Sequence, residues 1–106
     1  METTINRQEI TNIKDCVEYK ASSIVSNIVS KNTTSCMTVY AFDRGQSITP
    51  ITDASDIIVQ VLEGTAEVMV NMHNYDIADG DVIVMPKDKP HALFAKTKLK
   101  IASFRG

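Results

Sequence analysis

The chain has few side chains that could do chemistry, and the most promising of them is His91. This histidine follows Pro90 and begins an apolar segment, where burial would tune the pKa of its imidazole. It could donate a hydrogen bond to a ligand or act as a general base. Asp53 could support it if the fold brings the two side chains together. A backbone hydrogen bond for His91 and ordinary turn chemistry for Asp53 are the simpler explanations.

The other candidate nucleophiles and ligands have less support. The two cysteines, Cys16 and Cys36, do not form a CxxC pair and have no histidine beside them, so they are expected to be free thiols in a reducing compartment. The second histidine, His73, is expected to lie in a solvated turn at the far end of a hairpin.

Size and composition limit the classes of function. The chain has 106 residues, of which 43% are hydrophobic and 23% charged, with a net charge of −2, which fits one ordinary globular domain over residues 1–106. No basic patch suggests a nucleic-acid partner, and no apolar run approaches the ~20 residues that span a bilayer. The polar start of the chain has no apolar signal-peptide core, so a cytoplasmic location is expected.

The pattern of turns predicts an all-β fold. Short runs rich in β-branched residues alternate with Gly, Pro, Asn and Asp at intervals of roughly 8–12 residues, which is typical of an antiparallel sandwich or barrel with little or no helix. Residues 1–15 are expected to form a polar arm or an edge strand, and Pro50 restricts residues 46–56 to an edge, bulge or loop. The expected strands are residues 24–30, 36–42, 57–62, 66–72, 75–77, 82–85, 91–95 and 99–104.

Two sequence motifs point to a known family. The run from Gly80 to Pro86, followed by Pro90 and His91, resembles the second cupin motif, G-D-x-x-x-x-P-x-x-x-P-H. The run from Gly45 to Gly64 resembles the first cupin motif. The resemblance covers residues 36–104 and is closest to small, single-domain bacterial cupins. It implies a jelly-roll β-barrel, in agreement with the strand pattern.

The sequence departs from the family at the metal-ligand positions. By the motif alignment, the ligand positions of metal-binding cupins fall on Ile51, Asp53, Ile57 and His91. Isoleucine has no lone pair, and a transition metal normally needs about three or more protein donors. The metal site is therefore expected to be degenerate and the protein to have no cofactor, with His91 the one ligand position clearly retained.

Several functions remain open, and the first choice is a metal-free barrel that binds or senses a small molecule. Its pocket wall would consist of Ile51, Asp53, Ile57 and His91, which make an apolar site with one or two polar anchors. A metal-independent isomerase or hydrolase would use His91 with Asp53 on a small, possibly sugar-like substrate. A metal-dependent oxygenase or isomerase would need unusual ligands, and a purely structural module would have a closed lumen. The ligand itself cannot be named from the sequence.

The alternation along residues 57–62 bears on assembly. If Ile57 faces the lumen, Val59 and Val61 do so too, and Ile58 and Leu62 point outward. Because this strand is apolar at nearly every position, both of its faces should be covered. The cover could be the N-terminal strands or a second copy of the chain. The resemblance to small cupins, which are commonly dimers, favours a homodimer.

Overall fold

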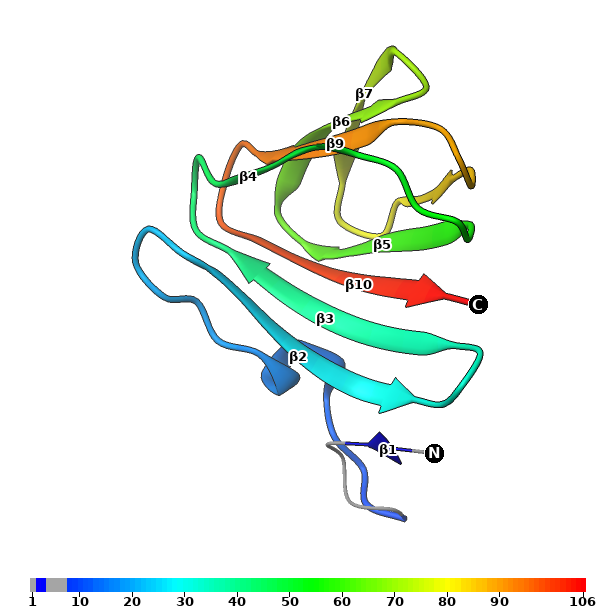
Figure 1. Ribbon diagram of the computed structural model, residues 1–106. Coiled ribbons are helices and arrows are strands. Elements are labelled where there is room, and N and C mark those ends of the chain that lie inside the picture. The colour runs from blue at the N-terminus through cyan, green and yellow to red at the C-terminus, as the bar shows by residue number, and fades with distance from the viewer. Residues whose placement is uncertain (1, 4–7) are drawn as a thin grey trace.

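The protein is an antiparallel β-barrel made of two facing sheets, as the turn pattern predicts (Figure 1). The computed structural model describes residues 2–3 and 8–106. One sheet has six strands in the order β1-β2-β3-β10-β5-β8, and the other has four in the order β4-β9-β6-β7. Within the described residues no helix is long and apolar enough to cross a membrane.

The strands follow the β-branched runs of the sequence closely. One short 3-10 helix, η1 (Ile13–Cys16), precedes most of them and was not foreseen. The hairpin turn that was expected at His73 falls two residues earlier, on Asn71 and Met72, both with positive φ. The strands are β1 (Glu2–Thr3), β2 (Ile24–Lys31), β3 (Cys36–Phe42), β4 (Ser47–Ile51), β5 (Ile57–Glu63), β6 (Thr65–Val70), β7 (His73–Ala78), β8 (Val82–Met85), β9 (His91–Ala95) and β10 (Leu99–Arg105).

The main core lies between the two sheets. Val59 and Val61 of β5 are buried in it, which is the alternation expected from the sequence. Burial of each such side chain contributes roughly 1.5–3 kcal/mol. The other buried members come from both sheets: Phe42, Ala66, Val68, Val70, Ile77, Met85, Leu93, Ala95, Leu99 and Ile101.

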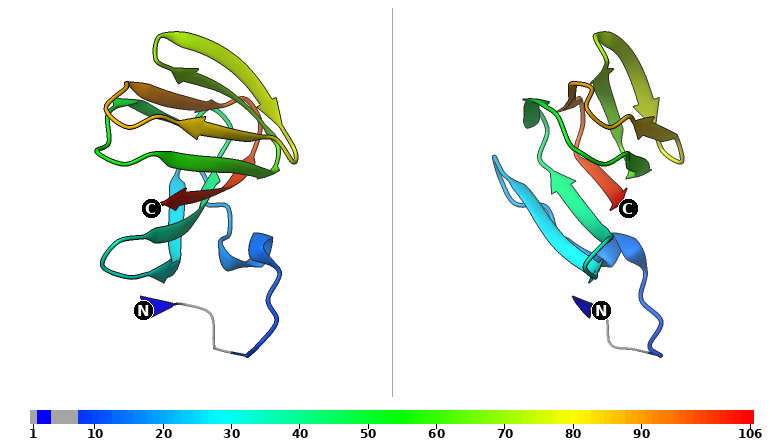
Figure 2. Two further views of the ribbon diagram at one scale, coloured as in Figure 1. Left: turned by 90° about the vertical axis from the view of Figure 1, so that its right-hand side faces the viewer. Right: turned by 45° about the vertical axis from the view of Figure 1, so that its right-hand side comes forward.

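The N-terminal segment covers part of the outer face of the six-stranded sheet. Leu62 packs there against a second apolar cluster that contains Val17 and Val39. Tyr19 links the segment to the end of β5, because its hydroxyl donates a hydrogen bond to Glu63 Oε2 at 2.8 Å. Figure 2 shows this segment beside β2 and β3, at the end of the molecule away from the four-stranded sheet.

Another part of this outer face is apolar and exposed in the single chain. Ile58 is 41% exposed, and its cross-strand neighbours Val84 and Phe104 are 51% and 45% exposed. The N-terminal segment thus covers Leu62 and leaves Ile58 exposed within a single chain, and cover of Ile58 by a second copy stays a prediction. We call the set of Ile58, Val84 and Phe104 the outer apolar patch.

Candidate functional site

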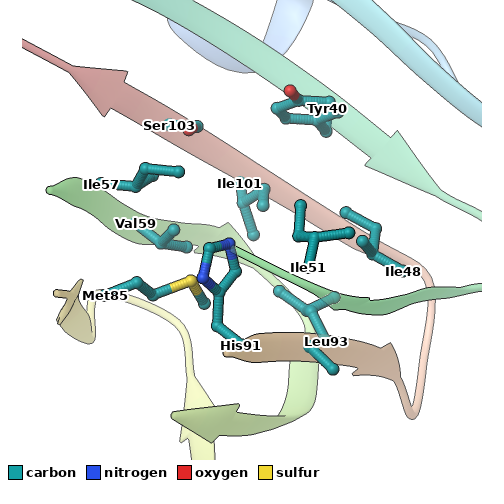
Figure 3. Close-up of a pocket in the computed structure, with 11 residues that line it drawn as sticks. Tyr40, Ile48, Ile51, Ile57, Val59, Met85, His91, Leu93, Ile101 and Ser103 are labelled. Carbon is teal, nitrogen blue, oxygen red and sulfur yellow. The ribbon is translucent and has the colours of Figure 1, made fainter. Parts of the chain in front are cut away.

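A cavity of about 80 Å³ lies between the two sheets, at the end where the motif residues meet (Figure 3). Strands from both sheets contribute to its wall, which is apolar apart from a few side chains. The lining residues are Tyr40, Ile48, Ile51, Ile57, Val59, Met85, His91, Ala92, Leu93, Ile101 and Ser103.

His91 is the most polar group of the inner wall. It begins β9, where it pairs with Ile51 of β4 and Val70 of β6. The residue is 6% exposed, and its Nδ1 is buried without a hydrogen-bond partner in the described part of the chain. Figure 3 shows the imidazole pointing from β9 toward Ile101. A buried nitrogen without a hydrogen-bond partner destabilises the fold by roughly 1–3 kcal/mol. The Nδ1 of His91 could therefore take one further hydrogen bond.

The structure brings three of the four expected site residues together. Ile51 from β4, Ile57 from β5 and His91 from β9 all line the cavity. Ile51 is also 46% exposed, so it forms part of the rim as well as the wall. Sequence positions as far apart as 51 and 91 meet here because β4 and β9 are neighbouring strands.

Asp53 lies outside this cavity, at its mouth. One carboxylate oxygen accepts from the Ser55 backbone N–H at 2.9 Å, and the other accepts from Arg105 Nη1 at 3.3 Å. The Ser55 hydrogen bond and the Arg105 charge hold the pKa of this carboxyl below its usual value. No hydrogen bond joins Asp53 to His91 among the described residues, although His91 lies close enough for its charge to act on the pKa of Asp53.

The mouth is a second hollow that continues from the cavity. It has a volume of about 220 Å³ and shares Tyr40, Ile51, Ile57 and Ser103 with the inner space. The polar side chains added here are those of Cys36, Thr38, Asp53 and Arg105. The site as a whole therefore has an apolar interior and a polar entrance.

Sequence reasoning did not identify Tyr40, Ser103 or Arg105 as site residues. Tyr40 is half-buried, and burial raises the pKa of its hydroxyl, which stays protonated. The alternation of β3 already placed Tyr40 on one face with Phe42, but the sequence does not say which face lines a lumen. Ser103 and Arg105 are two residues apart on β10 and therefore share a face of that strand. The sequence likewise does not say that this face lines the lumen.

The side chains present do not fit the metal that the cupin resemblance implies. Ile51 and Ile57 carry no donor atom, and Asp53 is engaged by Ser55 and Arg105. The described residues contain no group of three or more His, Cys, Asp or Glu side chains that could hold a metal ion. His91 is left as a single donor, which is too few for a transition metal.

The fold, the motifs and the site together define the class. The cupin domain model matches residues 38–103, and the chain belongs to this family. It is similar over 99% of its length to a conserved protein of unknown function from Streptococcus pyogenes, with 26% identity, a TM-score of 0.92 and 94% of that chain covered. It also resembles a cupin 2 conserved barrel domain protein from Leptotrichia buccalis at 29% identity, with a TM-score of 0.85, over 90% of this chain and 46% of that one.

A curated relative is similar over a shorter stretch. The Msm operon regulatory protein of Streptococcus mutans is 39% identical over 46 residues, which is 43% of this chain and 16% of the regulatory protein. The chain thus spans a small part of that relative's length. The expectation of a small bacterial cupin is confirmed by the family match and by the full-length structural similarity.

Proposed function

We propose that this cupin binds a small molecule in the cavity beside His91, without a metal, and that binding serves sensing rather than conversion. The observation that carries the proposal is the buried, unpartnered Nδ1 of His91 on an otherwise apolar wall. A largely apolar pocket with a few polar groups is the usual form of a small-molecule site. A ligand that hydrogen-bonds to the imidazole would remove the cost of the unpaired nitrogen.

The size of the cavity limits the part of the ligand that enters it. An engineered apolar cavity of ~150 Å³ holds benzene, and this one measures about 80 Å³. The inner part of the ligand is therefore about as large as a short, branched alkyl group. A larger ligand would keep the rest of its atoms in the mouth.

The competing functions have less support. An acid/base enzyme would need a hydrogen bond between Asp53 and His91, whereas the described hydrogen bonds of Asp53 are to Ser55 and Arg105. A metal-dependent enzyme would need donors that Ile51 and Ile57 do not supply. The stretch shared with a regulatory protein favours sensing over conversion.

The proposal can be tested by titrating the protein with 3-methylbutanamide, a neutral probe with a short branched body. We expect saturable NMR shifts of the His91 ring nitrogens and of the Val59 and Ile101 methyl groups. His91→Phe should weaken binding, whereas His73→Phe, at the exposed histidine on β7, should not. Absence of saturable shifts at these groups, for this amide, for shorter ones and for the corresponding acid, would refute the proposal.

A further inference from the structure

The geometry points to a short, apolar monocarboxylate as the ligand of this site, with its carboxylate bound by Arg105 at the mouth. This inference rests on the proposed function, because it assumes that the ligand enters the cavity beside His91, with its apolar body against the wall and one acceptor of its head group within reach of the imidazole. It adds the chemical class of the ligand and assigns Arg105 as the residue that selects it.

Arg105 supplies hydrogen-bond donors at the mouth. Arg105 has five N–H groups, and within the described residues its guanidinium makes one hydrogen bond, the 3.3 Å contact with Asp53. Its side chain is 50% exposed. Asp53 is the nearby acceptor, and its two oxygens already accept from Ser55 and Arg105. The guanidinium therefore keeps most of its donors for a ligand.

Two hydroxyl groups extend this supply toward the interior. Tyr40 and Ser103 line both the mouth and the cavity. The raised pKa of Tyr40 keeps its hydroxyl protonated and able to donate. Arg105 lies close enough for its charge to act on Tyr40. A head group rich in acceptors would thus meet donors from β3 and β10 while its body remained next to the apolar wall.

The charge balance selects a carboxylate among such head groups. Arg105 is matched by the single negative charge of Asp53, so a dianionic phosphate would place two further charges beside that carboxylate. A carboxylate adds one charge, and its two oxygens fit the planar guanidinium fork. An ammonium group is disfavoured here, because the Arg105 guanidinium would repel its positive charge.

Asp53 then has a definite role as a competitor. In the structure its Oδ2 accepts a single hydrogen bond from Arg105 Nη1 at 3.3 Å. This distance is long for a charge-assisted hydrogen bond. A ligand carboxylate can replace this contact with two parallel ones. Removing the charge of Asp53 should therefore strengthen the binding of an acid.

The experiment compares 3-methylbutanoate with 3-methylbutanamide, which have the same alkyl body, by calorimetric or NMR titration at fixed ionic strength. We expect the acid to bind roughly tenfold more tightly than the amide. Arg105→Gln should abolish this preference, because it should weaken binding of the acid far more than binding of the amide. Arg44→Gln is the matched control, because it removes an arginine beyond the other end of β3 and should preserve the preference.

Asp53→Asn gives an independent arm. A larger advantage of the acid over the amide is the expected result, whereas a smaller advantage would overturn the role given to Asp53 and the carboxylate assignment with it. 3-Methylbutyl phosphate binding more tightly than the acid would also overturn the assignment. If the amide binds in the cavity and the acid has no advantage, the carboxylate inference fails and the proposed function stands. If neither binds, both fail.

Discussion

Ile51 lies directly opposite His91 in the β4–β9 pair, and Ile57 faces the same cavity from β5. In metal-binding members of the family, the positions that align with these isoleucines carry metal ligands. The backbone of this chain therefore holds these positions close together, and the side chains of Ile51 and Ile57 carry no donor atoms.

Restoring donors at these positions should create a metal site. The double variant Ile51→His, Ile57→Glu would place an imidazole and a carboxylate beside His91, and three donors of this kind suit Zn²⁺ or Fe²⁺. We expect measurable affinity for Zn²⁺ by calorimetry. Without metal, Ile57→Glu should lower the free energy of unfolding by about 1–3 kcal/mol, because the new polar group is unpaired.

The single variant Ile51→His is the control, since two histidines alone should bind Zn²⁺ far more weakly. Because Ile51 is partly exposed, this variant should lose less stability than Ile57→Glu. A double variant that folds normally, keeps its apo stability and binds no metal would mean that the side chains at positions 51, 57 and 91 do not converge.

The unmodified protein should contain no stoichiometric transition metal. The reason is the donor set around His91, where Ile51 and Ile57 offer no lone pairs. Elemental analysis of untagged protein is the measurement. About one Mn, Fe, Ni, Cu or Zn per chain, lost on His91→Ala, would contradict this prediction.

The sequence predicted the barrel well because its signals are local. Alternation along residues 57–62 and the Gly, Pro and Asp turns indicate the strands, and which residues of a strand share a face, without knowledge of the rest of the chain. The two motifs likewise carried the information that Ile51, Ile57 and His91 belong to one region. These positions lie at strand ends, where spacing to a turn is informative.

The entrance of the site could not be predicted in the same way. Asp53 pairs with Arg105, which is 52 residues further along the chain, and no local pattern specifies such a partner. Tyr40 and Arg105 meet at the mouth because β3 and β10 are neighbours in the sheet. Strand order of this kind is a tertiary property, so the polar half of the site became visible in the structure alone.

Tyr19 should make stability depend on alkaline pH. Burial and the hydrogen bond to Glu63 raise the pKa of its hydroxyl in the folded protein. In the unfolded chain tyrosine ionises near pH ~10, so the stabilisation is complete below that pH and is lost as the pH rises above it. Tyr19→Phe should cost about 1 kcal/mol at neutral pH and make the alkaline loss of stability shallower.

Urea unfolding at several pH values between neutral and alkaline would measure both effects. Tyr75→Phe is the matched control, because Tyr75 lies exposed on β7 and its hydroxyl should contribute little. An alkaline decline as steep in Tyr19→Phe as in the unmodified protein would show that the contact with Glu63 does not hold the N-terminal segment.

The outer apolar patch predicts a homodimer. Ile58, Val84 and Phe104 are cross-strand neighbours in one row of the six-stranded sheet, and a second copy would remove this row from water. Sedimentation at micromolar concentration should give about twice the chain mass. Ile58→Lys should shift the protein toward monomer, because it places a charge in the middle of the row.

Met72→Lys is the control for this experiment. Met72 is an exposed apolar residue on the β6–β7 turn, outside the outer apolar patch, and its substitution should leave the dimer intact. A monomer in the unmodified protein at these concentrations would refute the prediction.

The irregular edge formed by β4 has a consequence for how copies of the chain can meet. β4 is the outer strand of its sheet, its pairing with β9 shifts between Ile48 and Ile51, and Pro50 within it has no N–H to offer. A strand from another molecule cannot continue the hydrogen-bond ladder along such an edge. Fibril-like growth is therefore discouraged on the side of the barrel where Ile51 forms the rim, and the entrance beside it stays open to solutes.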